Sequence, residues 1–186
     1  MLALAAPAGA GAQSVNPLEG MKFFVDQESP SWQQWRSLSR SGQTAKADLV
    51  WKIAREPKAL WLGRFTRPNF AVKVRRLIDR AAAEGAVPIF TVLRAQATAC
   101  GPTYDGGGPA EDRRTRDWYD RLARVIGDAR VVIAFEPDSL GTIDCLARSR
   151  RDDRISLLRH GVSALARLPN ATVYLEAGAS DWEPAA

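Results

Sequence analysis

The 186-residue sequence contains only two cysteines, Cys100 and Cys145, and a single histidine, His160. A structural zinc site takes four ligands, and two cysteines with one histidine cannot supply all four of them. A Ser-His-Asp triad would depend entirely on His160, which lies inside a predicted helix. The composition therefore predicts no metal and no cofactor, and it disfavours a triad hydrolase.

Long hydrophobic runs are also absent, since no stretch approaches the roughly 18 consecutive apolar residues that a membrane-spanning helix needs. Residues 1–12, MLALAAPAGAGA, are small, apolar and uncharged, and they end in Ala-Gly-Ala. They resemble the second half of a secretory signal peptide without its basic start; the alternative is an Ala-rich tail. We expect an exported protein without a membrane span, with a signal-peptide remnant at 1–12 and one domain over 13–186.

Lysine is scarce, with five lysines against 21 arginines, and the net charge is +5. A basic chain attracts phosphate, which raises the question of a nucleic-acid partner. The arginines are spread along the chain among acidic residues, and the densest cluster, RSRRDDR at 148–154, contains two aspartates. We therefore predict no nucleic-acid partner.

Short apolar segments alternate with helical patterns, which is typical of an α/β fold with parallel strands and right-handed crossovers. These strands could form an open doubly wound sheet or most of an α/β barrel. The expected strands are 22–26, 59–63, 87–92, 131–136 and 172–177, and the expected helices are 31–42, 69–84, 117–128 and 154–168. The expected core faces of the last three helices are Val72, Leu77 and Ala81; Trp118, Leu122 and Val125; and Leu158, Val162 and Leu165.

Carboxylates stand at the ends of three of these strands, the first being Asp26 at the end of 22–26. Glu136 and Asp138 follow the apolar run VVIAF within the motif EPDSLG, and Glu176 ends TVYL. Because ligand sites of parallel sheets gather at the carboxyl ends of the strands, these acids and Trp61 should share one rim. Pro137 should keep Glu136 extended. Carboxylates beside an aromatic residue suggest acid–base chemistry on a sugar; alternatively, each acid caps the following helix.

In an exported protein, Cys100 and Cys145 would form one disulfide, which stabilises the fold by about 4 kcal/mol in the chain-entropy model. The alternative is a pair of buried free thiols.

The sequence contains the following segments in this order: NPLEGMKFFVD, ALWLG, VPIFTV, a cysteine, EPDSLG, a second cysteine, LPNATVYLEAG and DW. In this order of segments the sequence resembles glycoside hydrolase family 6, a family of secreted endoglucanases and cellobiohydrolases. The resemblance runs from about Asn16 to Trp182. It implies the N-terminal part of the catalytic domain, an α/β fold of the distorted β/α barrel type, incomplete with about five parallel strands. It also implies a monomer that hydrolyses β-1,4-glucan, such as cellulose, with inversion. The residue roles that it implies or supports are Asp138 as general acid, Trp61, Glu136, Glu176 and Trp182 as substrate-binding residues, and a Cys100–Cys145 disulfide.

Three departures from the family pattern predict impaired activity. Ala99 replaces the Asp that assists the proton donor, and Leu93 replaces a Tyr of the subsite that distorts the sugar ring. YLEAGASDW replaces YLDAGHSGW, with Glu176 for the Asp and Ala179 for the His. The alternative function is a non-catalytic glucan-binding relative or a truncated pseudoenzyme.

Overall fold

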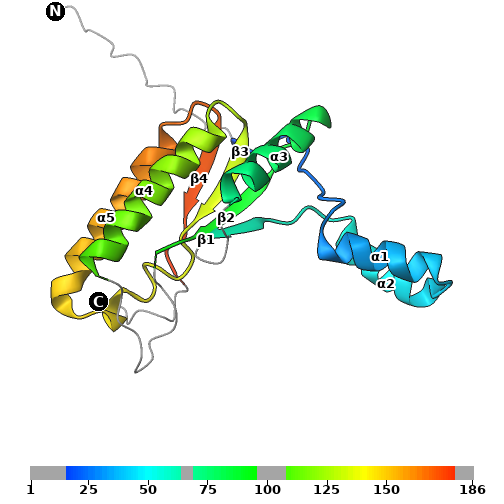
Figure 1. Ribbon diagram of the computed structural model, residues 1–186, viewed down its shortest axis with the longest axis horizontal. Coiled ribbons are helices and arrows are strands. Elements are labelled where there is room, and N and C mark those ends of the chain that lie inside the picture. Colours follow the sequence, from blue (N-terminus) through cyan, green and yellow to red (C-terminus); the bar gives the residue numbers. More distant parts are fainter. Residues whose placement is uncertain (1–15, 64–68, 96–107, 179–186) are drawn as a thin grey trace, which may run out of the picture.

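The computed structural model describes residues 16–63, 69–95 and 108–178 of the chain. Four parallel strands form one open sheet in the order β1-β2-β3-β4 (Figure 1). The strands are β1 (Leu60–Gly63), β2 (Ile89–Leu93), β3 (Val131–Phe135) and β4 (Ala171–Leu175). Strands that follow one another in the chain are neighbours in the sheet. Their parallel pairing confirms the prediction made from the alternation of strands and helices.

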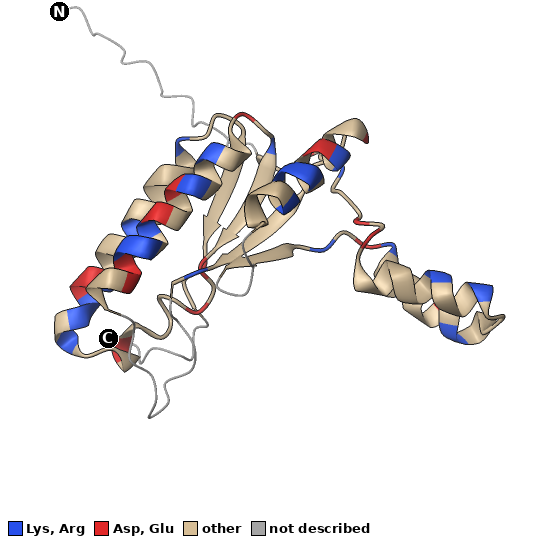
Figure 2. Cartoon of the chain, viewed as in Figure 1, with Lys and Arg blue, Asp and Glu red and all other residues tan. Residues whose placement is uncertain are grey.

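Three helices connect the strands and pack on one face of the sheet: α3 (Phe70–Ala83), α4 (Pro109–Ile126) and α5 (Arg148–Ala166) (Figure 1). A short 3₁₀ helix, η1 (Ile143–Cys145), lies in the connection between β3 and α5. Arginines and acidic residues are interleaved along α4 and α5 (Figure 2). Of the described helices, none is both long and apolar enough to cross a bilayer.

The core lies between the sheet and these three helices. Leu62, Val92 and Phe135 are paired across neighbouring strands and are all buried on the helix-covered face. Because successive side chains of a strand point to opposite faces, the row beside them faces the other way. That second row runs Trp61, Thr91, Ala134, Tyr174, and its two edge aromatics are 60% and 46% exposed.

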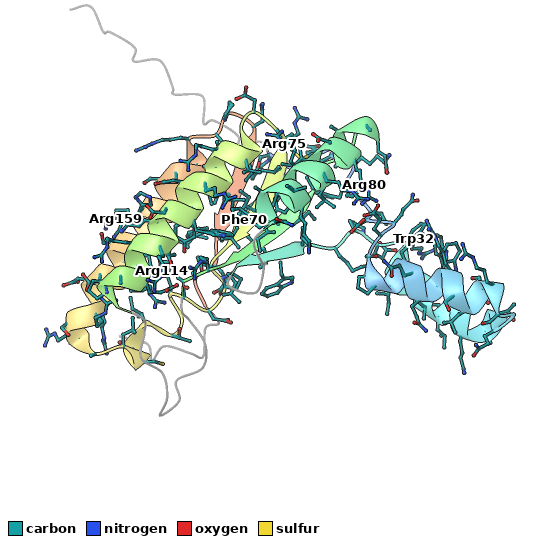
Figure 3. All side chains as sticks on the ribbon, in the orientation of Figure 1. Trp32, Phe70, Arg75, Arg80, Arg114 and Arg159 are labelled. Atoms are coloured by element: carbon teal, nitrogen blue, oxygen red, sulfur yellow. The ribbon has the colours of Figure 1, made fainter. Side chains whose placement is uncertain are left out.

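The helices predicted at 69–84, 117–128 and 154–168 are confirmed as α3, α4 and α5, although α4 and α5 begin earlier than predicted. Most of the predicted core residues are confirmed, because Leu77, Ala81, Leu122, Leu158 and Leu165 are buried and Trp118, Val125 and Val162 are partly buried against the core. The prediction for Val72 is wrong. On α3, Val72 is 67% exposed. Phe70 of the same helix (Figure 3) is buried and packs against Trp118 of α4, with ring centroids 5.1 Å apart. The reason is that stripes of 3.6-residue spacing overlap in this sequence, and packing selects among them. The buried residues are Phe70, Val74, Leu77, Ile78 and Ala81 on α3; Thr115, Tyr119, Leu122 and Ile126 on α4; and Arg154, Leu157, Leu158, Gly161 and Leu165 on α5.

The strand predicted at 22–26 is wrong, because the segment forms only one isolated parallel bridge, between Phe23 and Val87. A turn at residues 16–20 precedes it, and the Asp26 carbonyl accepts a hydrogen bond from the amide of Ser29 just after it. These turns leave too few extended residues for a ladder. The sheet therefore has four strands rather than the expected five.

Two further helices, α1 (Pro30–Arg40) and α2 (Thr44–Ala54), pack against each other to one side of the sheet (Figure 1). The first was predicted and is capped by the Ser29 side chain, which accepts from the amide of Trp32. The second was missed. Its aromatic residue Trp51 joins Trp32 and Trp35, with centroid separations of 4.5–5.3 Å, so the helix pair is held by its own aromatic cluster.

Gly161 allows α5 to approach β3 and α4 closely. A Cβ atom there would lie 2.4 Å from Cζ of Phe135 and 2.9 Å from the Tyr119 ring. Gly→Ala inside a helix normally stabilises by about 1 kcal/mol, because glycine loses more backbone entropy on folding. Here the overlap should dominate, and we expect Gly161→Ala to lower the free energy of unfolding by about 1–3 kcal/mol.

Urea unfolding followed by tryptophan fluorescence measures this change. Ser163→Ala on the same helix is the control and should change stability little. Phe135→Leu should recover part of the loss in the Gly161→Ala background, because it removes the atom that the new Cβ meets. A Gly161→Ala chain as stable as the original would show that the contact is not tight.

Candidate active site

The loop that follows β3 contains a turn with unusual backbone geometry. Glu136 and Asp138, on either side of Pro137, have φ angles of +50° and +68°. The prediction that Pro137 keeps Glu136 extended is therefore wrong. A left-handed conformation costs a non-glycine residue about 1–2 kcal/mol, so the surrounding contacts must hold this turn.

Asp138 is fixed through its backbone. Its amide donates a 2.7 Å hydrogen bond to Oε2 of Glu176, at the end of β4. Its carbonyl oxygen accepts 2.5 Å and 3.1 Å bonds from the hydroxyl and amide of Thr142. The Asp138 side chain is partly exposed, and its carboxylate accepts no hydrogen bond from the described residues. The backbone of Asp138 is thus held in place by hydrogen bonds, whereas its carboxylate is not held by any described residue.

Glu176 lies beside Asp138, as the strand-end argument predicted. Its amide donates a 3.2 Å bond to the carbonyl of Phe135, so the residue continues the pairing of β3 and β4. Its Oε1 accepts a bond from the amide of Gly178, while Oε2 holds Asp138. The carboxylate of Glu176 thus connects the loops that follow β3 and β4.

Glu136 is completely buried, with 0% exposure, so the prediction that it contacts substrate is corrected: its carboxylate contacts protein groups. Oε1 accepts from the amide of Arg94 at 2.8 Å and from the hydroxyl of Tyr119 at 2.6 Å. Oε2 accepts from the amide of Ala95 at 3.0 Å and from the hydroxyl of Ser139 at 3.5 Å. The side chain thus joins the end of β2, helix α4 and the turn that contains Asp138.

Burial raises the pKa of Glu136 to about 7, because the charged form loses its hydration. The hydrogen bonds from Tyr119 and from the Arg94 and Ala95 amides act against this shift, as does the positive charge of Arg154 on α5. Desolvation by burial, together with the charge of Glu136 and the hydrogen bond to it, raises the pKa of Tyr119 well above its usual value. Tyr119 therefore remains a neutral hydrogen-bond donor.

Trp61 lies on β1, two strands away from β3, on the sheet face opposite the helices. At a spacing of 4.7–4.9 Å between neighbouring strands, about 10 Å separates the strand of Trp61 from the strand that leads to Asp138. Its indole is largely exposed in the part of the chain that the structure describes. Leu93 ends β2 between them and is partly exposed.

Cys145 is disulfide-bonded. Cys100, Ala99 and Trp182 lie outside the described residues, as does the segment 1–12. Within the described ranges, no three His, Cys, Asp or Glu side chains converge as a metal site would require. The Nε2 atom of His160 lies 2.9 Å from Oδ1 of Asp120 on α4.

Sequence reasoning missed Tyr119, Ser139 and the amides of Arg94 and Ala95 as partners of Glu136. A signal for Tyr119 was available, since it shares a helical stripe with Leu122 and Ile126. The two amides leave no signal in the sequence, because every residue except proline has one.

Comparison with known proteins identifies the fold and the family. The sequence profile described as glycosyl hydrolases family 6 matches residues 18–185. Endoglucanase 1 of Streptomyces halstedii is 30% identical over 98% of this chain and 56% of its own length. Endoglucanase A of Thermobispora bispora is 28% identical over 97% of this chain and 41% of its own length. The chain thus spans about half the length of the curated relatives that it matches.

Solved structures agree with this result. The endoglucanase Cel6 of Mycobacterium tuberculosis, solved in complex with methyl-cellobiosyl-4-deoxy-4-thio-β-D-cellobioside, superposes with a TM-score of 0.75 at 33% identity, over 91% of this chain and 56% of that chain. The endoglucanase CEL6B of Humicola insolens, at 17% identity, has a TM-score of 0.65 over 87% of this chain and 51% of its own, and shows the shared fold. The four strands and their helices are part of the distorted barrel of these structures. The chain belongs to glycosyl hydrolases family 6.

Proposed function

We propose that this chain is part of an exported, monomeric β-1,4-glucanase that hydrolyses cellulose-like chains with inversion, and that Asp138 is the general acid. The relatives that carry the name endoglucanase support the reaction class. The catalytic region of the chain is the domain 13–186, and the disulfide of Cys145 is made with Cys100, the other cysteine of the sequence.

In the proposed reaction, Asp138 donates its proton to the glycosidic oxygen as the bond to the anomeric carbon breaks. A water molecule attacks that carbon from the opposite side of the ring and loses a proton to a base. The two groups that carry out such a reaction stand about 6.5–9.5 Å apart, which leaves room for the water. The product has the inverted, α configuration.

The geometry of the Asp138 turn is the observation that carries this proposal. The turn stands at the carboxyl end of a central strand, where α/β folds bind ligands. The Glu176 carboxylate and Thr142 fix its backbone, whereas the Asp138 carboxylate is left without a partner among the described residues. Fixing the backbone but not the carboxylate suits an acid that must transfer a proton.

We propose further that turnover by this chain is weak. Leu93 stands at the end of β2, where the family pattern has a Tyr, and a leucine side chain cannot make the polar contact of a phenol. Ala99 cannot assist a proton donor as an Asp would. Losing general acid–base assistance typically costs 10²–10⁴-fold in rate.

The stereochemistry of the product tests the proposal. Proton NMR of cellotetraose incubated with the chain should show the α anomer of the new reducing end first, before mutarotation. The β anomer as first product would contradict inversion. Absence of any product after long incubation would contradict the hydrolase function and leave glucan binding.

A non-catalytic glucan-binding protein is the second candidate, favoured by the exposed indole of Trp61. Titration calorimetry with cellotetraose should show binding that Trp61→Ala weakens about tenfold or more, a loss of about 1.4 kcal/mol or more. Leu49→Ala, an exposed apolar side chain on α2, is the control and should bind as the original chain does. Equal binding by the Trp61→Ala chain would remove this residue from the site.

A further inference from the structure

The Glu136 carboxylate is the most completely buried acidic group among the described residues, and the proposed reaction does not use it directly. A carboxylate offers about four lone-pair positions, and all four are occupied here by hydrogen-bond donors. Such an arrangement requires an acceptor at every position. A glutamine would place an N–H group against at least one donor.

Three of the donors come from parts of the chain that are distant in sequence. The Arg94 and Ala95 amides lie 42 and 41 residues away, just after β2, and the Tyr119 hydroxyl lies 17 residues away on α4. The backbone of Glu136 is bonded to the same region, since its amide donates a 2.7 Å bond to the carbonyl of Val92. The residue therefore fixes the loops after β2 and β3 relative to each other.

The start of the Asp138 turn also depends on Glu136. Its carbonyl accepts a 3.2 Å bond from the amide of Ser139, which spans the two residues of positive φ. Such a conformation persists only when neighbouring contacts determine it. The buried carboxylate at one end and Glu176 at the other provide those contacts.

We propose that Glu136 is a positioning residue: its buried carboxylate, bound to the amides after β2 and to Tyr119, sets the backbone conformation in which Asp138 presents its side chain. The inference rests on the proposed role of Asp138, but it concerns the conformation of the turn and can be measured without turnover. A change in the protonation of Glu136 must then alter the environment of the Asp138 amide.

Other charged groups surround this network and must be separated from it. Arg154 of α5 acts on Glu136 electrostatically. The side chain of Arg94 pairs with Glu111 of α4 at 2.7 Å. Partial burial raises the pKa of Glu111, but the hydrogen bonds and positive charges of Arg114 and Arg94 outweigh it, so that the pKa is lowered. Glu176 accepts a hydrogen bond from the Asp138 amide directly, so its carboxylate also affects that amide.

Amide NMR spectra of the full chain between pH 4 and pH 9 test the proposal. The chemical shifts of the Arg94, Ala95 and Asp138 amides should change with pH in one shared transition. The midpoint of that transition should equal the midpoint measured from the side-chain carbonyl carbon of Glu136. Glu136→Gln should remove that transition from all three amides. Glu176→Gln is the matched control. It should remove only the effect of Glu176 on the chemical shift of the Asp138 amide, and the three amides should keep their shared midpoint.

Tyr119→Phe provides a second variant that preserves the carboxylate, in case Glu136→Gln does not fold. Loss of a donor that favours the charged form should raise the shared midpoint by about one to two pH units. Arg94 and Ala95 amides that follow Glu136 while the Asp138 amide does not would overturn the proposal. Failure of Asp138→Asn to affect hydrolysis would instead overturn the proposed function and leave this coupling intact.

Discussion

Replacing Asp138 by Asn is expected to lower the rate of β-1,4-glucan hydrolysis by about 10²–10⁴-fold, the usual contribution of a general acid. Asparagine has nearly the same shape and keeps the backbone amide that donates to Glu176, so the turn should be preserved. The amide side chain cannot donate a proton to a leaving oxygen. Release of reducing sugar from a soluble cellulose derivative measures the change.

Asp152→Asn is the matched control, because Asp152 is an exposed acid on α5. It should hydrolyse as the unaltered chain does. If the unaltered rate is close to the detection limit, the comparison is made in the Ala99→Asp background, which restores the assisting acid of the family pattern. Equal rates with and without the Asp138 carboxyl group would exclude it from the reaction.

The free energy of unfolding should fall by about 3 kcal/mol between pH 4 and pH 8, relative to that of Glu136→Gln. The pKa of Glu136 rises from 4.5 to about 7 on folding. Between these values the unfolded chain has lost the proton and the folded chain keeps it, so stability decreases as pH rises. Each pH unit of this interval is worth about 1.4 kcal/mol.

The comparison with Glu136→Gln cancels the other titrating groups, among them Glu111, whose lowered pKa acts in the opposite direction. Urea unfolding at a series of pH values gives the difference. Glu84→Gln, which removes an exposed acid, is the matched control. A difference for Glu136→Gln that is constant across this range would mean that Glu136 titrates at the same pH in both states.

The sequence by itself determined the fold class and the family. Short apolar runs such as VVIAF and IFTVL can be buried on both faces only as inner strands of an α/β sheet, and they are β3 and β2. A chain that ends such strands with acids brings those acids together, as Asp138 and Glu176 show. This part was predictable because it depends on local patterns and on the direction of parallel strands.

Only the tertiary structure determined how deeply each acid is buried and which groups it contacts. Glu136 and Asp138 are two residues apart in one motif, yet the first is fully buried and the second is partly exposed. That difference comes from the positive φ angles of the turn and from donors 17 to 42 residues away in the chain. The tertiary structure also determined that Val74 rather than Val72 lies in the core. Sequence periodicity reports how often apolar residues recur, whereas the partner that each side chain meets depends on long-range packing.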